Sequence, residues 1–420
     1  MRLGVALTLV LAAAIVVGLA RGGDGDVVIR PGEVAAPAAT ARTGAATELV
    51  SRLGEALARG DERGAAALAP ADDPRAAARL AAVARNVRAL RLTDVSLRFV
   101  DQSGSLAPDG RWTATVEATW RLAGLDPRAA DAEIGVRLLQ RGGTLAVTGF
   151  GGAGRAPLWT TGPLTVLRGP RTLVLAQRPA DARRLDALAR TAVRQVAGRL
   201  DLPSTRLVVE APGSGSALDA ALAAEPGTYR QIAAVTAPVD GSPPGRAPIH
   251  VLVNPDVLNR LDRAGAQVVL THETVHAATR APASRAPSWL IEGFADWVAL
   301  QEVRLPLRTT TARLAARIAR EGLPRRLPTS ADFAVDRTDL EASYEAAWQL
   351  CVTIADAAGP DALRALYDRS ADGSAFAADL RRTTGLTEAR LLALWRTRLG
   401  ELPRASTGSG ARSVPDRPAA

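Results

Sequence analysis

Hydrophobic residues recur at helical spacing in two segments near the start of the chain. In the first segment, leucines recur every four residues and a glycine follows them: Leu49, Leu53, Leu57 and Gly60. This spacing places the leucines on one face and predicts a helix over residues 45–59. A second helix is predicted to begin at Asp73-Pro74, because aspartate caps helix N-termini and proline suits the first turn. Its apolar face carries Leu80, Val83 and Val87.

The pattern then changes from helical spacing to alternation. Apolar and polar residues alternate from Trp112 to Trp120, which predicts a strand with one buried face. Further strands are expected within residues 90–100, 134–138 and 145–147, and a last hairpin around residues 168–170. Helices followed by an antiparallel meander predict a curved α+β roll over residues 45–177. This order of elements resembles that of nuclear-transport-factor-like domains.

The second half of the chain predicts a small sheet followed by many helices. A helix is expected over residues 181–200, and three short strands are expected at residues 206–210, 231–236 and 249–253. From residue 263 the apolar spacing is helical almost to residue 399. Residues 403–420 lack apolar periodicity, which is typical of a disordered tail. We therefore predict an α+β protein with two folded domains, the roll and a second domain over residues 183–402.

The extreme N-terminus carries a separate signal. Residues 3–20 are uncharged and almost wholly apolar, with Arg2 before them and Arg21 after them. A segment of this length at residues 1–20 is either a secretory signal peptide or an uncleaved membrane anchor. Both alternatives place the remaining chain outside the cytoplasm, as a secreted or a membrane-anchored protein. Residues 21–44 are rich in Gly, Ala and Pro and are expected to form a linker.

Composition changes this picture little. The 420 residues include no lysine, and a formal net charge of +9 comes from arginines that are interspersed with Asp and Glu. No basic block with interleaved aromatic residues is present, so the charge pattern does not indicate nucleic-acid binding. The single cysteine, Cys351, cannot form an intramolecular disulfide and is expected to be a small buried residue.

The chemistry of the chain concentrates in residues 268–280, which read VVLTHETVHAATR. His272 and His276 are four residues apart, and on a helix both imidazoles then face the same side and can bind one metal ion. Glu273 lies next to the first histidine, where it can act on a water molecule without binding the metal. Only three histidines occur in the chain, so its composition does not account for an HExxH arrangement by chance. The third histidine, His250, is expected to be a strand residue without function.

A second acidic motif follows after a break in the helix. Residues 289–297 read WLIEGFADW, and Pro282 and Pro287 interrupt the chain between this motif and His276. A second helix can therefore return Glu292 to the histidines, and two imidazoles with one carboxylate form a three-ligand zinc site with an open position. Asp296 lies on the same helical face, where it can accept the N–H of a ligand histidine and fix its tautomer.

HExxH followed by this W-L-x-E-G-x-A-D motif resembles the gluzincin branch of the zinc metallopeptidases, the thermolysin-like peptidase MA superfamily. The resemblance covers roughly residues 183–400 and is specific over residues 268–297. It implies that His272, His276 and Glu292 bind one zinc ion, that Glu273 is the general base, and that Asp296 orients a ligand. It also implies that residues 249–253 form the edge strand along which an extended substrate lies. These enzymes often use a downstream His or Tyr to stabilise the oxyanion, and Tyr344 is the best candidate because no histidine follows His276.

The function predicted from these residues is zinc-dependent hydrolysis of peptide bonds in a peptide or protein substrate outside the cytoplasm. The membrane is a further partner if the N-terminal segment is not cleaved. The alternative is a catalytically inactive zincin-like protein that binds a partner or acts as a scaffold at the cell envelope. An intact Glu273 favours the enzyme, because a structural metal site needs no base.

Overall fold

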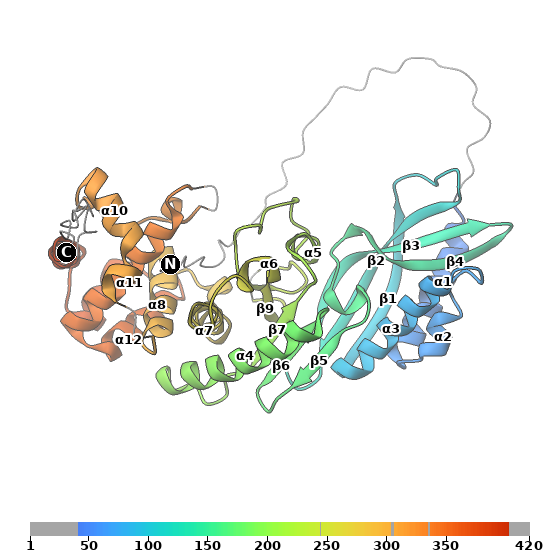
Figure 1. Cartoon of the computed structure of the whole chain (residues 1–420), viewed down its shortest axis with the longest axis horizontal. Coiled ribbons are helices and arrows are strands. Elements are labelled where there is room, and N and C mark those ends of the chain that lie inside the picture. The colour runs from blue at the N-terminus through green and yellow to red at the C-terminus, as the bar shows by residue number, and fades with distance from the viewer. Residues whose placement is uncertain (1–40, 244, 304–305, 335–336, 403–420) are drawn as a thin grey trace, which may run out of the picture.

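The computed structural model describes residues 41–402, except residues 244, 304–305 and 335–336 (Figure 1). The described part begins with three helices: α1 (Thr43–Ala58), α2 (Glu62–Ala66) and α3 (Pro74–Leu90). Asp73 caps α3 by accepting a hydrogen bond from the backbone N–H of Ala76. The apolar face of α3 is buried. Both helices expected from the leucine and valine spacing are therefore confirmed.

Helices α1 and α3 pack on an antiparallel sheet of four strands, and α2 packs on α1 and α3. The strands follow one another in the order β1-β2-β3-β4: β1 (Leu92–Ser103), β2 (Arg111–Leu122), β3 (Ala130–Arg141) and β4 (Thr144–Gly154). The alternation in β2 has the expected effect, because Trp112, Val116 and Trp120 enter the core while the intervening residues stay partly exposed. Two register shifts occur between β1 and β2, and such irregularities increase the local twist of a sheet.

A second, mixed sheet of five strands follows, in the order β5-β6-β7-β9-β8. Its strands are β5 (Thr165–Arg168), β6 (Thr172–Ala176), β7 (Leu207–Ala211), β8 (Ala234–Pro238) and β9 (Ile249–Val253). The hairpin expected around residues 168–170 is present as β5 and β6, but it pairs with β7 in the second sheet and not with the first sheet. The expectation that residues 249–253 form the edge strand is wrong, because β9 lies between β7 and β8. The edge strand is β8.

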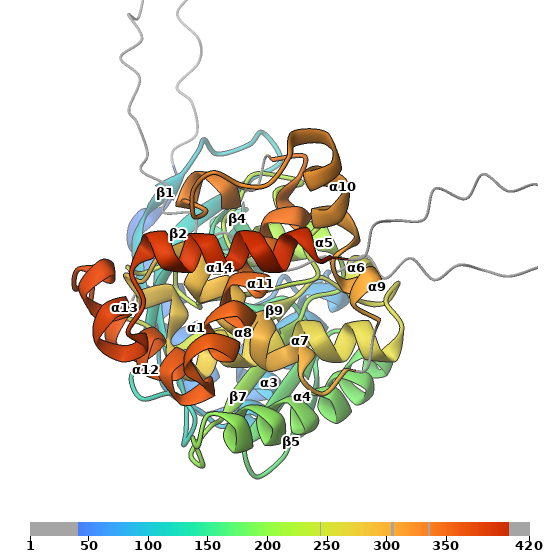
Figure 2. The same ribbon diagram turned by 90° about the vertical axis from the view of Figure 1, so that its left-hand side faces the viewer.

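The remaining chain is mostly helical, as its spacing predicted. The long helix α4 (Pro179–Arg199) and the helix α7 (Arg263–Thr279) pack on the second sheet and on each other. The C-terminal helices include α8 (Ser288–Leu300), α11 (Leu340–Ala358) and α14 (Glu388–Gly400), and Figure 2 looks onto this part, with α14 in front of α11. The other helices and 3-10 turns are α5 (Gly215–Ala221), α6 (Pro255–Leu258), α9 (Leu307–Thr310), α10 (Ala312–Glu321), α12 (Pro360–Ser370), α13 (Phe376–Thr384), η1 (Leu158–Thr160), η2 (Ala281–Ala283) and η3 (Ser330–Phe333).

The architecture therefore agrees with the predicted α+β class: helices and an antiparallel sheet first, then a small sheet and a helical C-terminal part. The largest core lies between the first three helices and the first sheet, and it continues into the second sheet through Leu173 and Leu175 of β6. The expected signal or anchor at residues 1–20, most of the expected linker at residues 21–44 and the tail at residues 403–420 lie outside the described residues. The linker ends earlier than predicted, because residues 43 and 44 already belong to α1. Within the described residues, no helix is both long and apolar enough to cross a membrane.

Candidate metal centre

Helix α7 carries the HExxH residues and has well-defined ends. Asp262 caps its N-terminus by accepting a hydrogen bond from Gly265 N at 2.8 Å, and Arg280 ends it with a left-handed backbone (φ 56°). From residue 268 to residue 276 every side chain of this helix is buried. Because the helix is surrounded on all sides at this level, the two imidazoles lie inside the protein, with ring centroids 4.5 Å apart.

Helix α8 supplies the carboxylates. The turn η2 reverses the chain after α7, and Pro287 precedes the first residue of α8. Glu292 and Asp296 lie four residues apart on α8 and both face α7, so each reaches a histidine. The Pro-containing break that the sequence predicted between the two motifs is therefore present, and it produces the expected return of Glu292 to the histidines.

The three predicted ligands converge on one point. His272 Nε2 lies 3.3 Å and His276 Nε2 lies 3.2 Å from the same oxygen, Glu292 Oε2. Candidate ligand atoms of the three residues all lie within 4.8 Å of one another, and they form a buried group that could hold a metal ion. His272 Nε2 is buried and has no hydrogen-bond partner among the described residues, although buried ring nitrogens are normally satisfied. A metal ion bound by the two Nε2 atoms and the carboxylate would satisfy this nitrogen, so the residues fit the ion.

Asp296 fixes the orientation of the first histidine. Its Oδ1 atom lies 2.8 Å from His272 Nδ1, and both groups are buried. Burial lowers the pKa of His272, but the charge of Asp296 and the hydrogen bond to it outweigh burial and raise the pKa to about 10. When His272 Nδ1 donates to Asp296, Nε2 is the nitrogen left to bind a metal. The contact is the one expected from the spacing of Glu292 and Asp296.

Glu273 lies beside the ligands but does not join them. It is fully buried, and burial raises the pKa of its carboxyl group. Its Oε2 atom accepts a hydrogen bond from Thr236 Oγ1 at 2.6 Å, and its Oε1 atom has no partner among the described residues. Thr236 belongs to the edge strand β8, so this contact joins the edge of the sheet to the centre. The sequence offered no signal for Thr236, because the contact crosses 37 residues.

Tyr344 lies on α11, which packs against α8. Its ring is buried and makes an edge-to-face contact with Phe333, with centroids 5.6 Å apart. Burial raises the pKa of Tyr344 well above its usual value, and the charges of Glu292, Asp296 and Glu273 raise it further. The charges that act on Tyr344 are those of the metal centre, and its role as a donor to the oxyanion stays a prediction.

A glycine allows α11 to approach α8 so closely. A Cβ atom added to Gly293 would lie 2.3 Å from the backbone oxygen of Ala347 and 2.9 Å from Cys351 Sγ, both on α11. Only a residue without a side chain fits at this helix contact. Gly293 directly follows Glu292, so the same contact sets the position of the carboxylate. Cys351 is unpaired and buried, as the sequence predicted.

His250 lies away from the metal centre, in the buried strand β9. Its Nδ1 atom lies 2.7 Å from Glu210 Oε1 on β7, and its Nε2 atom lies 3.0 Å from Asp126 Oδ1, which follows β2 of the first sheet. Burial lowers the pKa of His250, but the charges and hydrogen bonds of the two carboxylates raise it to about 10. The imidazolium thus links the two sheets, a role that its position in a strand did not predict.

Comparison with known proteins assigns this chain to no family. No protein-family model matches the sequence, and a search of curated proteins finds no match. The resemblance to gluzincins therefore stays a prediction from the motif residues.

Proposed function

We propose that this protein is a zinc-dependent peptidase that acts outside the cytoplasm, with Glu273 as its general base. The proposal is supported by the convergence of His272 Nε2, His276 Nε2 and Glu292 on one point. The carboxylate of Glu273 lies beside this point and does not belong to the ligand set. Structural zinc sites usually have four protein ligands, whereas catalytic sites have three and an open position. The described residues provide three ligands and a free base, which supports a catalytic role.

The donor set favours zinc among the common metal ions. Calcium and magnesium prefer oxygen ligands only, whereas two imidazoles and one carboxylate are typical of zinc. A zinc ion bound here supplies Lewis acidity, which polarises a carbonyl group and acidifies a water molecule. Asp296 holds the imidazole of His272 in the tautomer that leaves Nε2 available.

Glu273 supplies the proton transfers. Its Oε1 atom has no partner among the described residues. This atom can accept a proton from a water molecule that attacks a peptide carbonyl carbon, and it can then deliver the proton to the leaving amine. Thr236 holds the other oxygen, Oε2, and thereby restricts the rotation of the carboxylate. A base held in this way stays aligned with the reacting atoms, which reduces the entropy lost on reaching the transition state.

The edge strand β8 offers a place for an extended substrate. It ends the five-stranded sheet, so one side of its backbone pairs with no other described strand. An extended peptide can add to such an edge through main-chain hydrogen bonds. Thr236 in the middle of β8 contacts Glu273 directly, so a peptide bound along this strand would pass the base. Tyr344 is the proposed donor to the oxyanion that forms on the substrate carbonyl.

The test compares the full-length protein with Glu273→Gln, which keeps the shape of the side chain and removes its basicity. We expect both proteins to bind one zinc ion, measured by metal analysis, and only the parent to cleave a peptide library. Removal of a general base lowers the rate by about 10²–10⁴-fold. Glu225→Gln is the matched control, because Glu225 is exposed and lies outside the centre; this variant should cleave like the parent.

Two outcomes would contradict the proposal. If the parent binds no zinc, the ligand assignment of His272, His276 and Glu292 is wrong. If both proteins bind zinc and neither cleaves any peptide, the result favours the inactive zincin-like binding or scaffold protein. Tyr344→Phe tests the proposed oxyanion donor separately. Loss of this donor should lower the cleavage rate by about 10²–10³-fold and leave zinc binding unchanged.

A further inference from the structure

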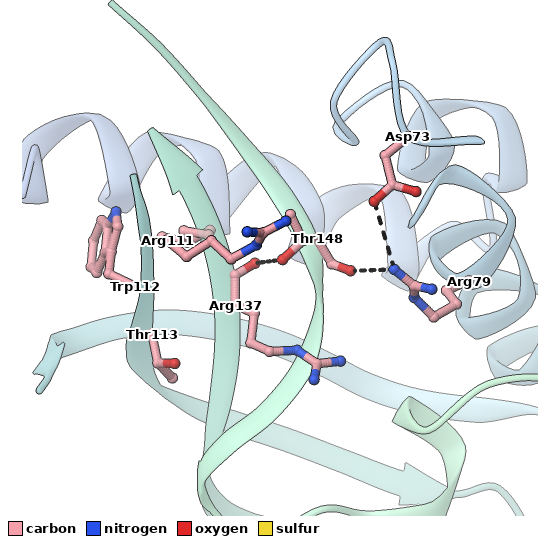
Figure 3. A pocket seen from close by; sticks show the side chains of 8 residues that line it. Asp73, Arg79, Arg111, Trp112, Thr113, Arg137 and Thr148 are labelled. Atoms are coloured by element: carbon pink, nitrogen blue, oxygen red, sulfur yellow. Dashed lines mark hydrogen bonds and ion pairs between the residues drawn. The ribbon is translucent and has the colours of Figure 1, made fainter. Parts of the chain in front are cut away.

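A groove opens on the first sheet. In Figure 1 this sheet lies on the right, away from α7 and α8, which carry the metal centre. It has a volume of about 550 Å³. Its walls come from the start of α3 and from strands β2, β3 and β4, and Figure 3 shows the side chains that line it. Three of these side chains are arginines, Arg79, Arg111 and Arg137, whereas Asp73 is the only acidic residue among those that line the groove.

The side chains of two of the arginines approach the same glycine. Gly149 in β4 has a φ of +146° and no side chain. A Cβ atom built on it would lie 3.0 Å from Arg137 Nη2 and 3.7 Å from Arg79 Nε. The two guanidinium groups come from different elements, a strand and a helix, yet both reach the same point. The space beside Gly149 is therefore bordered by positive charge from two directions.

The positive charge of this groove is only partly neutralised by the protein. Arg79 donates to the backbone oxygen of Thr148 at 3.0 Å, and its nearest carboxylate is Asp73 at 3.9 Å. Arg111 pairs with Asp109 at the rim. The guanidinium group of Arg137 forms no hydrogen bond or ion pair with any described residue. Like charges that lie close together are unfavourable without a counter-ion, so an anion bound between Arg79 and Arg137 would relieve their repulsion.

We propose that this groove binds the phosphate group of an anionic ligand, between the guanidinium groups of Arg137 and Arg79. Guanidinium groups match the oxygens of phosphate geometrically and form charge-assisted hydrogen bonds with them. A tetrahedral phosphate can accept from two donors that approach from different directions, as these two do. The groove, at about 550 Å³, is much larger than a phosphate group and leaves room for an organic part of the ligand.

The test is a calorimetric titration of the full-length protein with inorganic phosphate at low salt. We expect saturable binding at one site that weakens as salt is added, because the arginines are exposed to solvent. Arg137→Gln should weaken binding roughly tenfold or more through the loss of charge-assisted hydrogen bonds. The matched control is Arg52→Gln. Arg52 is an exposed arginine of α1 that also lacks a partner among the described residues, so this variant removes the same charge elsewhere.

Arg137 is exposed, and its guanidinium group pairs with no described residue, so Arg137→Gln should unfold at the same temperature as the parent. Equal weakening by Arg137→Gln and Arg52→Gln would show a non-specific effect of net charge and overturn the proposal, as would the absence of saturable binding to the parent. Vesicles distinguish the source of the phosphate. Binding to phosphatidylglycerol vesicles that Arg137→Gln abolishes and free phosphate inhibits supports a lipid headgroup. Phosphate binding without such vesicle binding supports a soluble phosphate compound.

Discussion

Replacing Gly293 by alanine tests whether the contact between α8 and α11 positions the metal centre. The added Cβ atom would lie 2.3 Å from the backbone oxygen of Ala347 and 2.5 Å from its carbonyl carbon. Neither atom belongs to a flexible side chain, so the two helices must separate. Non-bonded carbon and oxygen atoms rarely approach closer than about 3.2 Å, so the separation needed is roughly 1 Å.

The energetic effect has two opposing parts. Overpacking of this kind costs about 1–3 kcal/mol, and a clash with backbone belongs at the upper end. Alanine is a better helix former than glycine by about 1 kcal/mol, so we expect Gly293→Ala to lower the free energy of unfolding by about 1–2 kcal/mol. A displacement of roughly 1 Å at Glu292 should also weaken metal binding by about tenfold or more, because ligand geometry determines affinity.

The assay is denaturant unfolding together with metal titration, and Gly198→Ala is the matched control. Gly198 lies near the end of α4, and a Cβ atom there would meet nothing within 4 Å. The control should therefore gain up to about 1 kcal/mol from helix propensity alone and leave metal binding unchanged. If Gly293→Ala and Gly198→Ala have the same free energy of unfolding, α8 and α11 do not approach as closely at Gly293 as described. That result would refute the reasoning.

Two further predictions concern buried imidazoles. Asp296→Asn removes the charge that orients His272 and should lower metal affinity by about 10–100-fold in a metal titration, with cleavage lost in parallel; unchanged affinity would show that Asp296 has no orienting role. His250 has a folded-state pKa of about 10 against a usual 6.5, so its stabilisation is complete below pH 6.5 and is lost as the pH rises toward 10. At pH 6 the free energy of unfolding of the parent should exceed that of His250→Gln by on the order of a few kcal/mol. Denaturant titrations should show this difference shrink as the pH rises from 6.5 toward 10. A difference that does not change with pH would contradict this assignment.

Much of the candidate site could be predicted because its decisive relations are local. His272 and His276 share a helix face because any α-helix places residues four apart on one side. Glu292 and Asp296 follow the same rule on α8, and the prolines between the two motifs indicated a turn. The alternation in β2 likewise predicted which of its residues enter the core. These properties depend on backbone geometry within one or two elements, so the sequence alone determined them.

The relations that only the tertiary structure decided are those between distant segments. Strand β8 precedes β9 in the chain but lies outside it in the sheet, because strand order depends on how helices and loops pack and not on the pattern within a strand. The contact of Thr236 with Glu273 spans 37 residues, and that of His250 with Asp126 spans 124. The convergence of Arg79 and Arg137 beside Gly149 is of the same kind. No sequence pattern marks these polar residues or their partners. Their partners depend on how the whole chain packs, because buried polar groups must form hydrogen bonds with whichever groups the fold brings close.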